Sequence, residues 1–287
     1  MADKKTVDIP LPFGARLLLS FVKFSDKYFP LIAQQIILSQ FYHPIRFTQN
    51  QNYPPIFKQA KEFELSISKQ KVIAYSWGKG PLVLLCHGWS GWAGQMGEFV
   101  EPLLAKGFRV VAFDGPAHGR SSGKRTTQID FVECVRNIEK RYGPIVAMVG
   151  HSFGGVCTLM ALKEGIKIPK AVIIGTPASL PEMIEETRKK FNVSEKTISI
   201  IPQNIKHRTG KDYHEFSAEH IAQFVNIPIL VIHDKDDVDV SFENAHTLSN
   251  IIKQSSLLIT NGKGHRRILR DSEVIQKVVE YVSQIPN

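Results

Sequence analysis

The sequence has few cysteines and no long hydrophobic run. Its three cysteines, Cys86, Cys134 and Cys157, do not form the close pairs that zinc and redox sites use. No stretch approaches the roughly 20 apolar residues that span a bilayer. The apolar run after Arg16 reaches Lys23 without the small-residue cleavage site of a signal peptide. These features predict one large domain with core cysteines, in a cytoplasmic protein.

The sequence also lacks the pattern of a nucleic-acid-binding protein, despite a formal charge of +9. Residues 1–80 hold eleven Lys or Arg against five Asp or Glu, so most of the excess lies there. These basic residues are spread singly, without the interleaved aromatics of a base-stacking surface. We therefore interpret them as a solvated basic face and expect no nucleic-acid partner.

No internal repeat is present, and short apolar runs alternate with longer amphipathic segments from residue 61 onward. This alternation predicts an α/β protein, with a mostly parallel central sheet and helices on both faces. The predicted strands are Glu62–Ile67, Val72–Trp77, Leu82–Cys86, Arg109–Phe113, Ile145–Val149, Ala171–Ile174, Ile229–Ile232 and Ser256–Thr260. The first two form an antiparallel pair. Helices are predicted near 94–106, 128–142, 153–164, 242–252 and 271–282.

Two segments interrupt this pattern and set the predicted domain organisation. Residues 178–226 are too long for an ordinary connection, so they form either a lid or cap over the sheet edge or a plain surface excursion. Residues 1–60 form an N-terminal helical extension beside a core of residues 61–177 and 227–287. Its apolar stripes either pack on the core or attach residues 1–45 weakly to an anionic membrane, which would make the protein peripheral. The oligomeric state is left open.

The strongest chemical signal is Gly150-His151-Ser152-Phe153-Gly154, between a predicted strand and a predicted helix. A serine on such a tight turn adopts strained backbone angles, and glycines at positions 150 and 154 let the neighbouring chain pass closely. The Phe153 N–H lies at the positive end of the helix, where it can stabilise an oxyanion. Ser152 is therefore the predicted nucleophile.

A serine nucleophile needs a base, and the base needs an orienting acid. Four aspartates, at positions 234, 236, 237 and 239, follow one predicted strand, and His265 follows the last strand. Because parallel strands point the same way, both loops leave the same sheet edge as Ser152. The order Ser, Asp, His is the one that the G-x-S-x-G pattern requires.

From about Glu62 to its C-terminus the chain resembles the α/β-hydrolase superfamily, a family of serine esterases and lipases. The resemblance implies Asp237 as the acid, with Asp236 as the alternative, and turn or capping roles for Asp234 and Asp239. It also implies that Cys86-His87-Gly88-Trp89 forms the oxyanion loop. The Trp89 N–H would then be the second oxyanion donor beside that of Phe153, and His87 and Gly88 would support the loop.

The resemblance implies a carboxylesterase or lipase that uses Ser152, His265 and Asp237 to cleave small-molecule ester or acyl substrates through an acyl-enzyme. A thioesterase or an acyltransferase would use the same triad, and a non-catalytic binding protein with this fold is a further alternative. The remaining histidines, among them His118, lack metal-ligand spacing. No metal and no cofactor is therefore expected. In Asp114-Gly115-Pro116-Ala117-His118-Gly119, Ala117 stands where the family more often has glycine.

Overall fold

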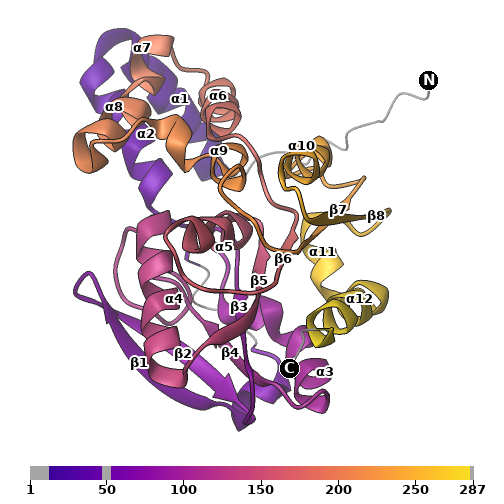
Figure 1. The fold of residues 1–287 in the computed structure, drawn as a ribbon. Coiled ribbons are helices and arrows are strands. Elements are labelled where there is room, and N and C mark those ends of the chain that lie inside the picture. Colours follow the sequence, from indigo (N-terminus) through magenta and orange to yellow (C-terminus); the bar gives the residue numbers. More distant parts are fainter. Residues whose placement is uncertain (1–12, 47–52, 285–287) are drawn as a thin grey trace. The chain divides into compact units, whose positions relative to one another are not determined.

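The computed structural model describes residues 13–46 and 53–284, and these residues divide into two compact units. The helical unit joins the N-terminal segment up to Phe41 to Pro181–Asp212. The sheet unit holds Tyr42–Leu180 and the chain from Tyr213 onward. Figure 1 shows the elements of both units, which are described separately below.

The sheet unit is built on an eight-stranded mixed sheet with the order β1-β2-β4-β3-β5-β6-β7-β8. The pairs β1–β2 and β2–β4 are antiparallel, and the other five pairs are parallel. The predicted α/β class is confirmed. The strands are β1 (Lys61–Ile67), β2 (Gln70–Trp77), β3 (Leu82–Cys86), β4 (Arg109–Phe113), β5 (Ile145–His151), β6 (Ala171–Ile174), β7 (Ile229–Asp234) and β8 (Ser255–Thr260).

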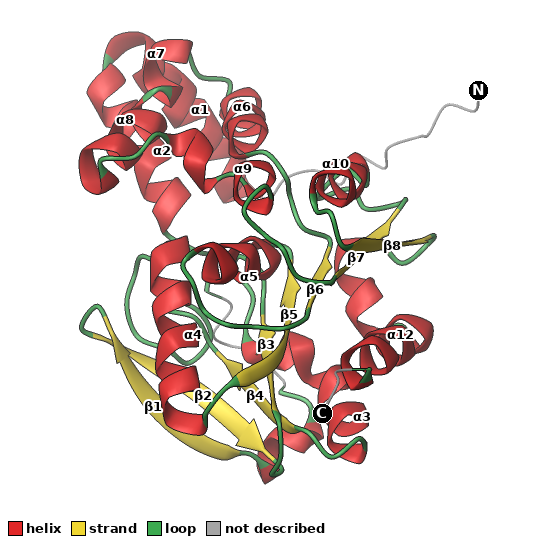
Figure 2. Cartoon of the chain, in the orientation of Figure 1, coloured by secondary structure: helices red, strands yellow, loops and turns green. Residues whose placement is uncertain are grey.

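Helices cover both faces of this sheet, as Figure 2 shows. They are η1 (Pro55–Gln59), η2 (Ala93–Phe99), α3 (Val100–Ala105), α4 (Gln128–Tyr142), α5 (Phe153–Lys163), η3 (Tyr213–Phe216), α9 (Ala218–Ala222), α10 (Glu243–Ile251), α11 (Gly264–Arg267), η4 (Ile268–Arg270) and α12 (Ser272–Ser283). The single helix expected over 94–106 is divided into η2 and α3. Pro102 has no N–H to donate one turn back, so the α-helical pattern begins only at Val100.

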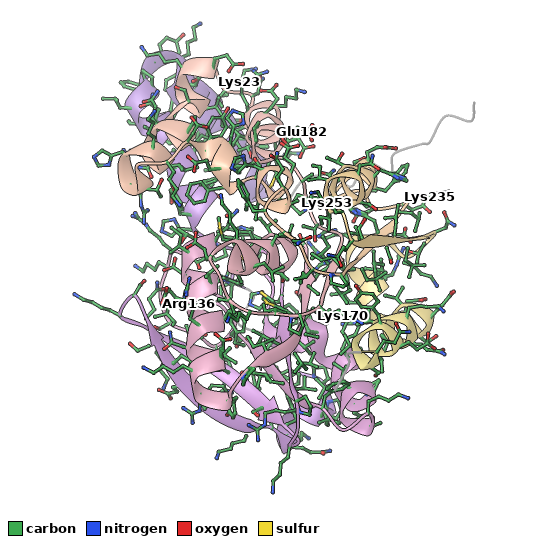
Figure 3. The ribbon with its side chains drawn as sticks, in the orientation of Figure 1. Lys23, Arg136, Lys170, Glu182, Lys235 and Lys253 are labelled. Atoms are coloured by element: carbon green, nitrogen blue, oxygen red, sulfur yellow. The ribbon has the colours of Figure 1, made fainter. Side chains whose placement is uncertain are left out.

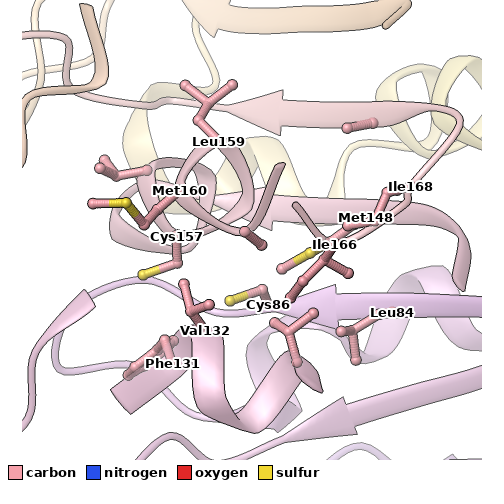
Figure 4. Packing of buried hydrophobic residues seen from close by; sticks show 14 of the residues in the cluster. Leu84, Cys86, Phe131, Val132, Met148, Cys157, Leu159, Met160, Ile166 and Ile168 are labelled. Atoms are coloured by element: carbon pink, nitrogen blue, oxygen red, sulfur yellow. The ribbon is translucent and has the colours of Figure 1, made fainter. Parts of the chain in front are cut away.

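The central strands are buried on both sides because their side chains alternate between two cores. On β3, Leu84 and Cys86 pack with α4 and α5, whereas Val83 and Leu85 pack with η2, α3 and α12. Figure 4 shows the first of these cores, where Cys86 lies close to Cys157. All three cysteines are free and buried, and burial raises the pKa of each thiol.

The helical unit consists of two N-terminal helices and three helices from the insertion: α1 (Phe13–Tyr28), α2 (Pro30–Tyr42), α6 (Leu180–Phe191), α7 (Glu195–Ile198) and α8 (Ile200–Thr209). Hydrogen bonds join the two segments, because Asp26 accepts from the Ser194 N–H and hydroxyl, and Gln34 donates to the Lys196 carbonyl. This division differs from the expected 1–60 extension, because residues 13–41 cluster with the insertion while 53–60 belong to the sheet unit. Residues 1–12 lie outside the described part of the chain.

Candidate active site

The parallel strands end in register at one edge of the sheet. Cys86 pairs with Gly150, His151 with Ile174, and Asp234 with Thr260. The segments that follow β3, β5, β6, β7 and β8 therefore leave the same edge. The residues expected to form the triad and the oxyanion hole lie on four of these segments, those after β3, β5, β7 and β8.

Ser152 stands alone between β5 and α5, with φ 53° and ψ −119°. A positive φ is costly for a residue with a side chain, and it persists only where the surroundings enforce it. The Ser152 N–H donates to the Ile174 carbonyl at 2.8 Å, and its own carbonyl accepts from the Gly155 N–H at 2.9 Å. Both ends of the residue are thus fixed, and its side chain is partly exposed.

Glycines let the chain pass close to this turn. A Cβ on Gly154 would lie 2.3 Å from the Cys86 carbonyl oxygen, and a Cβ on Gly150 would lie 2.4 Å from the Gly154 carbonyl oxygen. On the facing loop, a Cβ on Gly88 would lie 3.0 Å from the Cβ of Ser152. Side chains at these positions would push apart the end of β3, the turn and the start of α5.

Two buried histidines fix the loop after β3. His87 Nε2 accepts from the Gly115 N–H at 2.9 Å, so its Nδ1 carries the proton that is donated to the Gly88 carbonyl at 2.7 Å. His118 Nε2 accepts from the Ser90 N–H at 3.0 Å. Burial is the main cause of the lowered pKa of both imidazoles, which favours the neutral form that these hydrogen bonds need.

The two N–H groups expected to stabilise an oxyanion belong to Phe153, which follows Ser152, and to Trp89, which follows Gly88 on the facing loop. Among the described residues no hydrogen bond uses the Trp89 N–H, and the Phe153 N–H opens α5, where a helix offers no internal acceptor. The Trp89 and Phe153 rings meet edge to face at 5.2 Å between centroids, and both are partly exposed. Polar donors and an apolar wall therefore lie next to the serine. Ala117, in the neighbouring loop, has φ 65°, which explains why glycine is commoner there.

Asp237 and His265 form a close pair. Asp237 Oδ2 lies 2.7 Å from His265 Nδ1, and Asp237 Oδ1 accepts the N–H groups of Asp239 and Val240, both at 2.9 Å. The Asp237 side chain is 1% exposed and that of His265 10%. The alternative acid, Asp236, is exposed and instead accepts the Gly262 N–H.

A second histidine contacts the same carboxylate. His233 Nε2 lies 3.3 Å from Asp237 Oδ2 and 3.0 Å from the Val240 carbonyl oxygen, and because both are acceptors this nitrogen carries the proton. Burial raises the pKa of Asp237, but hydrogen bonds from His233, His265 and the Val240 N–H outweigh it and leave the pKa below its usual range. The carboxylate is therefore ionised at neutral pH.

Asp234, for which the sequence predicted a turn or capping role, is buried. It joins the loop after β7, which carries the expected acid Asp237 (the acid loop), to the loop after β8, which carries the expected base His265 (the base loop). Its Oδ1 accepts the N–H groups of Asp236 and Gly264, both at 2.9 Å. Its Oδ2 accepts the Thr260 hydroxyl at 2.7 Å and the Lys263 N–H at 3.1 Å. Four donors on one carboxylate hold the segment that leads into His265.

His151, the neighbour of Ser152, connects the serine turn to the base loop. Its Nε2 donates to the His265 carbonyl at 2.8 Å, and the two rings lie 4.7 Å apart between centroids. Burial, with the His265 charge as a smaller cause, lowers the pKa of His151 to about 3, so the imidazole is neutral. Within the described residues no hydrogen bond joins the Ser152 hydroxyl directly to His265.

Comparison with known proteins places this site in a family. Residues 81–226 match the alpha/beta hydrolase fold family, and residues 206–284 match a family described as TAP-like protein. The first match covers half of the chain. The chain belongs to the α/β-hydrolase fold family.

Individual relatives of this hydrolase-fold chain include esterases and lipases. It is 28% identical over 140 residues to the pimeloyl-[acyl-carrier protein] methyl ester esterase of Nitrosospira multiformis, covering 46% of this chain and 51% of that one. It is 27% identical over 133 residues to the monoglyceride lipase of Rattus norvegicus, covering 42% and 44%. The chain thus spans about half the length of these relatives.

Among solved structures, the esterase Pf2001 of Pyrococcus furiosus superposes with a TM-score of 0.66 at 21% identity. The superposition covers 84% of this chain and 96% of the esterase. At this identity the likeness concerns the fold, which agrees with the sheet order described above.

The sequence reasoning assigned no role to His151 or His233, and it gave Asp234 only a turn or capping role. One feature of the sequence could have indicated roles for His233 and Asp234: these two polar residues end β7, which is otherwise apolar. Polar residues there face partners rather than solvent, because β7 is buried along its whole length. His233 contacts the loop directly after β7, whereas Thr260, Lys263 and Gly264, which bind Asp234, lie 26 to 30 residues further on and could not be inferred from local sequence.

Proposed function

We propose that this chain is a serine hydrolase that cleaves carboxylic esters, with Ser152 as nucleophile, His265 as general base and Asp237 as the orienting acid. The observation that carries the proposal is the Asp237–His265 pair at 2.7 Å on the edge where Ser152 stands in its strained turn. The esterases and lipases among the relatives support the same reaction class.

In this proposal the Ser152 hydroxyl attacks the ester carbonyl while His265 Nε2 takes its proton. The His265 Nδ1–H donates to ionised Asp237, which stabilises the imidazolium that forms. The N–H groups of Trp89 and Phe153 stabilise the oxyanion of the tetrahedral intermediate. His265 then returns the proton to the leaving alcohol, and water releases the acid from Ser152 by the same steps.

The half-buried rings of Trp89 and Phe153 favour an apolar acyl group next to the serine. Phe153 packs in turn on Phe131, at 5.2 Å between centroids, so its ring is held in place. We therefore expect esters with an alkyl acyl chain to react faster than acetate esters.

The test combines fluorophosphonate labelling, located by peptide mass spectrometry, with turnover of p-nitrophenyl esters of increasing chain length. We expect one adduct, on Ser152, and loss of turnover by about a millionfold in Ser152→Ala. Ser66→Ala, which changes an exposed serine on β1, is the matched control and should react like the wild type. Thioester substrates assayed in parallel separate an esterase from a thioesterase.

Folded protein with neither adduct nor turnover would refute the proposal and favour a non-catalytic binding protein. Folding is checked in each variant by its thermal unfolding, so that loss of structure is not mistaken for loss of the nucleophile.

A further inference from the structure

One segment of the helical unit exposes an unusual number of large apolar side chains. Eight of the fourteen that are exposed in the described chain lie within residues 17–32. They are Leu17, Leu18, Phe21, Phe24, Tyr28, Phe29, Leu31 and Ile32. We call this set the apolar face. Scattered apolar residues are normal on a protein surface, but a concentrated patch marks an interaction site.

Part of this face runs along α1 as far as Phe29, between α1 and α2. Its members on α1 include Leu17, Phe21, Phe24 and Tyr28, whose spacing of four, three and four residues places them on one side of a helix. Phe24 lies 4.9 Å from Tyr28 and 6.1 Å from Phe29 between ring centroids. Val22 and Ser25, on the stripe of α1 next to these four residues, are buried. The helix is therefore packed along that stripe, and the side chains of the apolar face beside it are left exposed.

The charges around this face are positive. Arg16, Lys23 and Lys27 are exposed on α1, and Lys23 is labelled in Figure 3. The Lys27 ammonium lies 5.0 Å from the centre of the Tyr28 ring. Asp26, the one acidic residue of α1 and α2, accepts two hydrogen bonds from Ser194 and so turns its charge toward α7.

We propose that the apolar face docks on a lipid bilayer that contains anionic lipid. A helix with aromatic and aliphatic side chains on one side and basic residues beside them lies in the membrane interface, with lysines at the phosphate level. No helix in the described part of the chain is long and apolar enough to cross a bilayer, so α1 would lie along the surface. A second copy of the chain docked on this face would instead place its own Arg16, Lys23 and Lys27 near those of the first copy, and these like charges would repel one another.

The test is flotation of the full chain with phosphatidylcholine vesicles, with and without phosphatidylserine. We expect flotation with the anionic vesicles and a loss with rising salt. Phe21→Ser with Phe24→Ser should weaken binding by more than about tenfold, since each ring removes apolar area that would leave water. Both phenylalanine residues are 52% exposed, so the fold should tolerate the change. Phe224→Ser, at a phenylalanine 60% exposed in the sheet unit, is the matched control.

A second variant separates charge from apolar contact. Lys23→Gln with Lys27→Gln should weaken binding to the anionic vesicles by about tenfold or more and leave binding to neutral vesicles unchanged. Neither double variant touches the catalytic machinery, so turnover of a soluble ester should stay at the wild-type rate. The docking proposal and the catalytic proposal can thus fail independently.

Three outcomes would overturn the proposal. One is the absence of flotation by the wild type. Another is flotation that stays at the wild-type level in the Phe21→Ser, Phe24→Ser double variant, or that falls as much in the Phe224→Ser control as in that double variant. The third is a dimer in sedimentation analysis that the same two changes abolish, which would assign the face to a second copy of the chain.

Discussion

The substitution Asp234→Asn should loosen the loop that carries His265. The Asp234 carboxylate accepts four hydrogen bonds and donates none, and it is 1% exposed. Burial raises its pKa, but the bonds from Thr260 and from the Gly264, Asp236 and Lys263 N–H groups leave the pKa below its usual value. The charged form is therefore the one that the fold requires.

The size of the effect follows from these partners. An asparagine keeps one acceptor oxygen, and its amide nitrogen must face one of the two donor pairs. The better orientation places that nitrogen by Thr260, whose hydroxyl can turn to accept, and leaves only the Lys263 N–H without a partner. One buried N–H without an acceptor and the weaker bonds of a neutral oxygen together cost about 2–4 kcal/mol.

Urea unfolding at neutral pH measures this cost, and ester turnover measures the displacement of His265. We expect kcat/KM to fall by about tenfold to a hundredfold, since misplacing a catalytic group by about 1 Å has effects of that order. Asp236→Asn is the matched control, because that carboxylate is exposed, and it should cost less than about 1 kcal/mol. If Asp234→Asn unfolded at the same urea concentration as Asp236→Asn, or kept full turnover, the four hydrogen bonds of Asp234 would not be what holds the His265 loop.

Two further predictions concern the serine turn and the acid. Gly154→Ala should destabilise the chain by about 3 kcal/mol or more, because its Cβ would meet the backbone carbonyl of Cys86 at 2.3 Å. Gly14→Ala, in α1 with nothing within 4 Å of its Cβ, should be neutral or stabilising by up to about 1 kcal/mol, and equal melting temperatures for the two variants would contradict this. Because the folded chain holds the pKa of Asp237 low, its carboxylate stabilises the fold at neutral pH, and this contribution is lost as the pH falls below about 4. The unfolding free energy of Asp237→Asn should therefore vary less between about pH 5 and pH 2 than that of the wild type. If the unfolding free energies of the two proteins fell equally over this range, the low pKa given to Asp237 would be wrong.

Much of the sheet unit could be predicted from local patterns. A short continuous apolar run such as Leu82–Cys86 is typical of a strand that is buried on both faces, because every side chain is then removed from water. The structure has this strand at the same bounds. The N-terminal segment was harder to place. Its apolar periodicity predicts helices, but which side chains are buried depends on which segment packs against them. That segment lies around Ser194, 168 residues from its partner Asp26.

The residues of the candidate site divide in the same way. The sequence by itself determined the turn around Ser152, because strand, glycine spacing and helix are local, and it also determined the order in which an acid and a base follow. Only the tertiary structure decided that Asp237 rather than Asp236 meets His265, and that Asp234 and His151 fix the base loop. The physical reason is that neighbouring residues of a loop point their side chains in different directions, so that one carboxylate meets His265 and the next faces solvent. Which of the two meets His265 depends on how β7 and β8 are placed, and these strands come together only when the sheet forms.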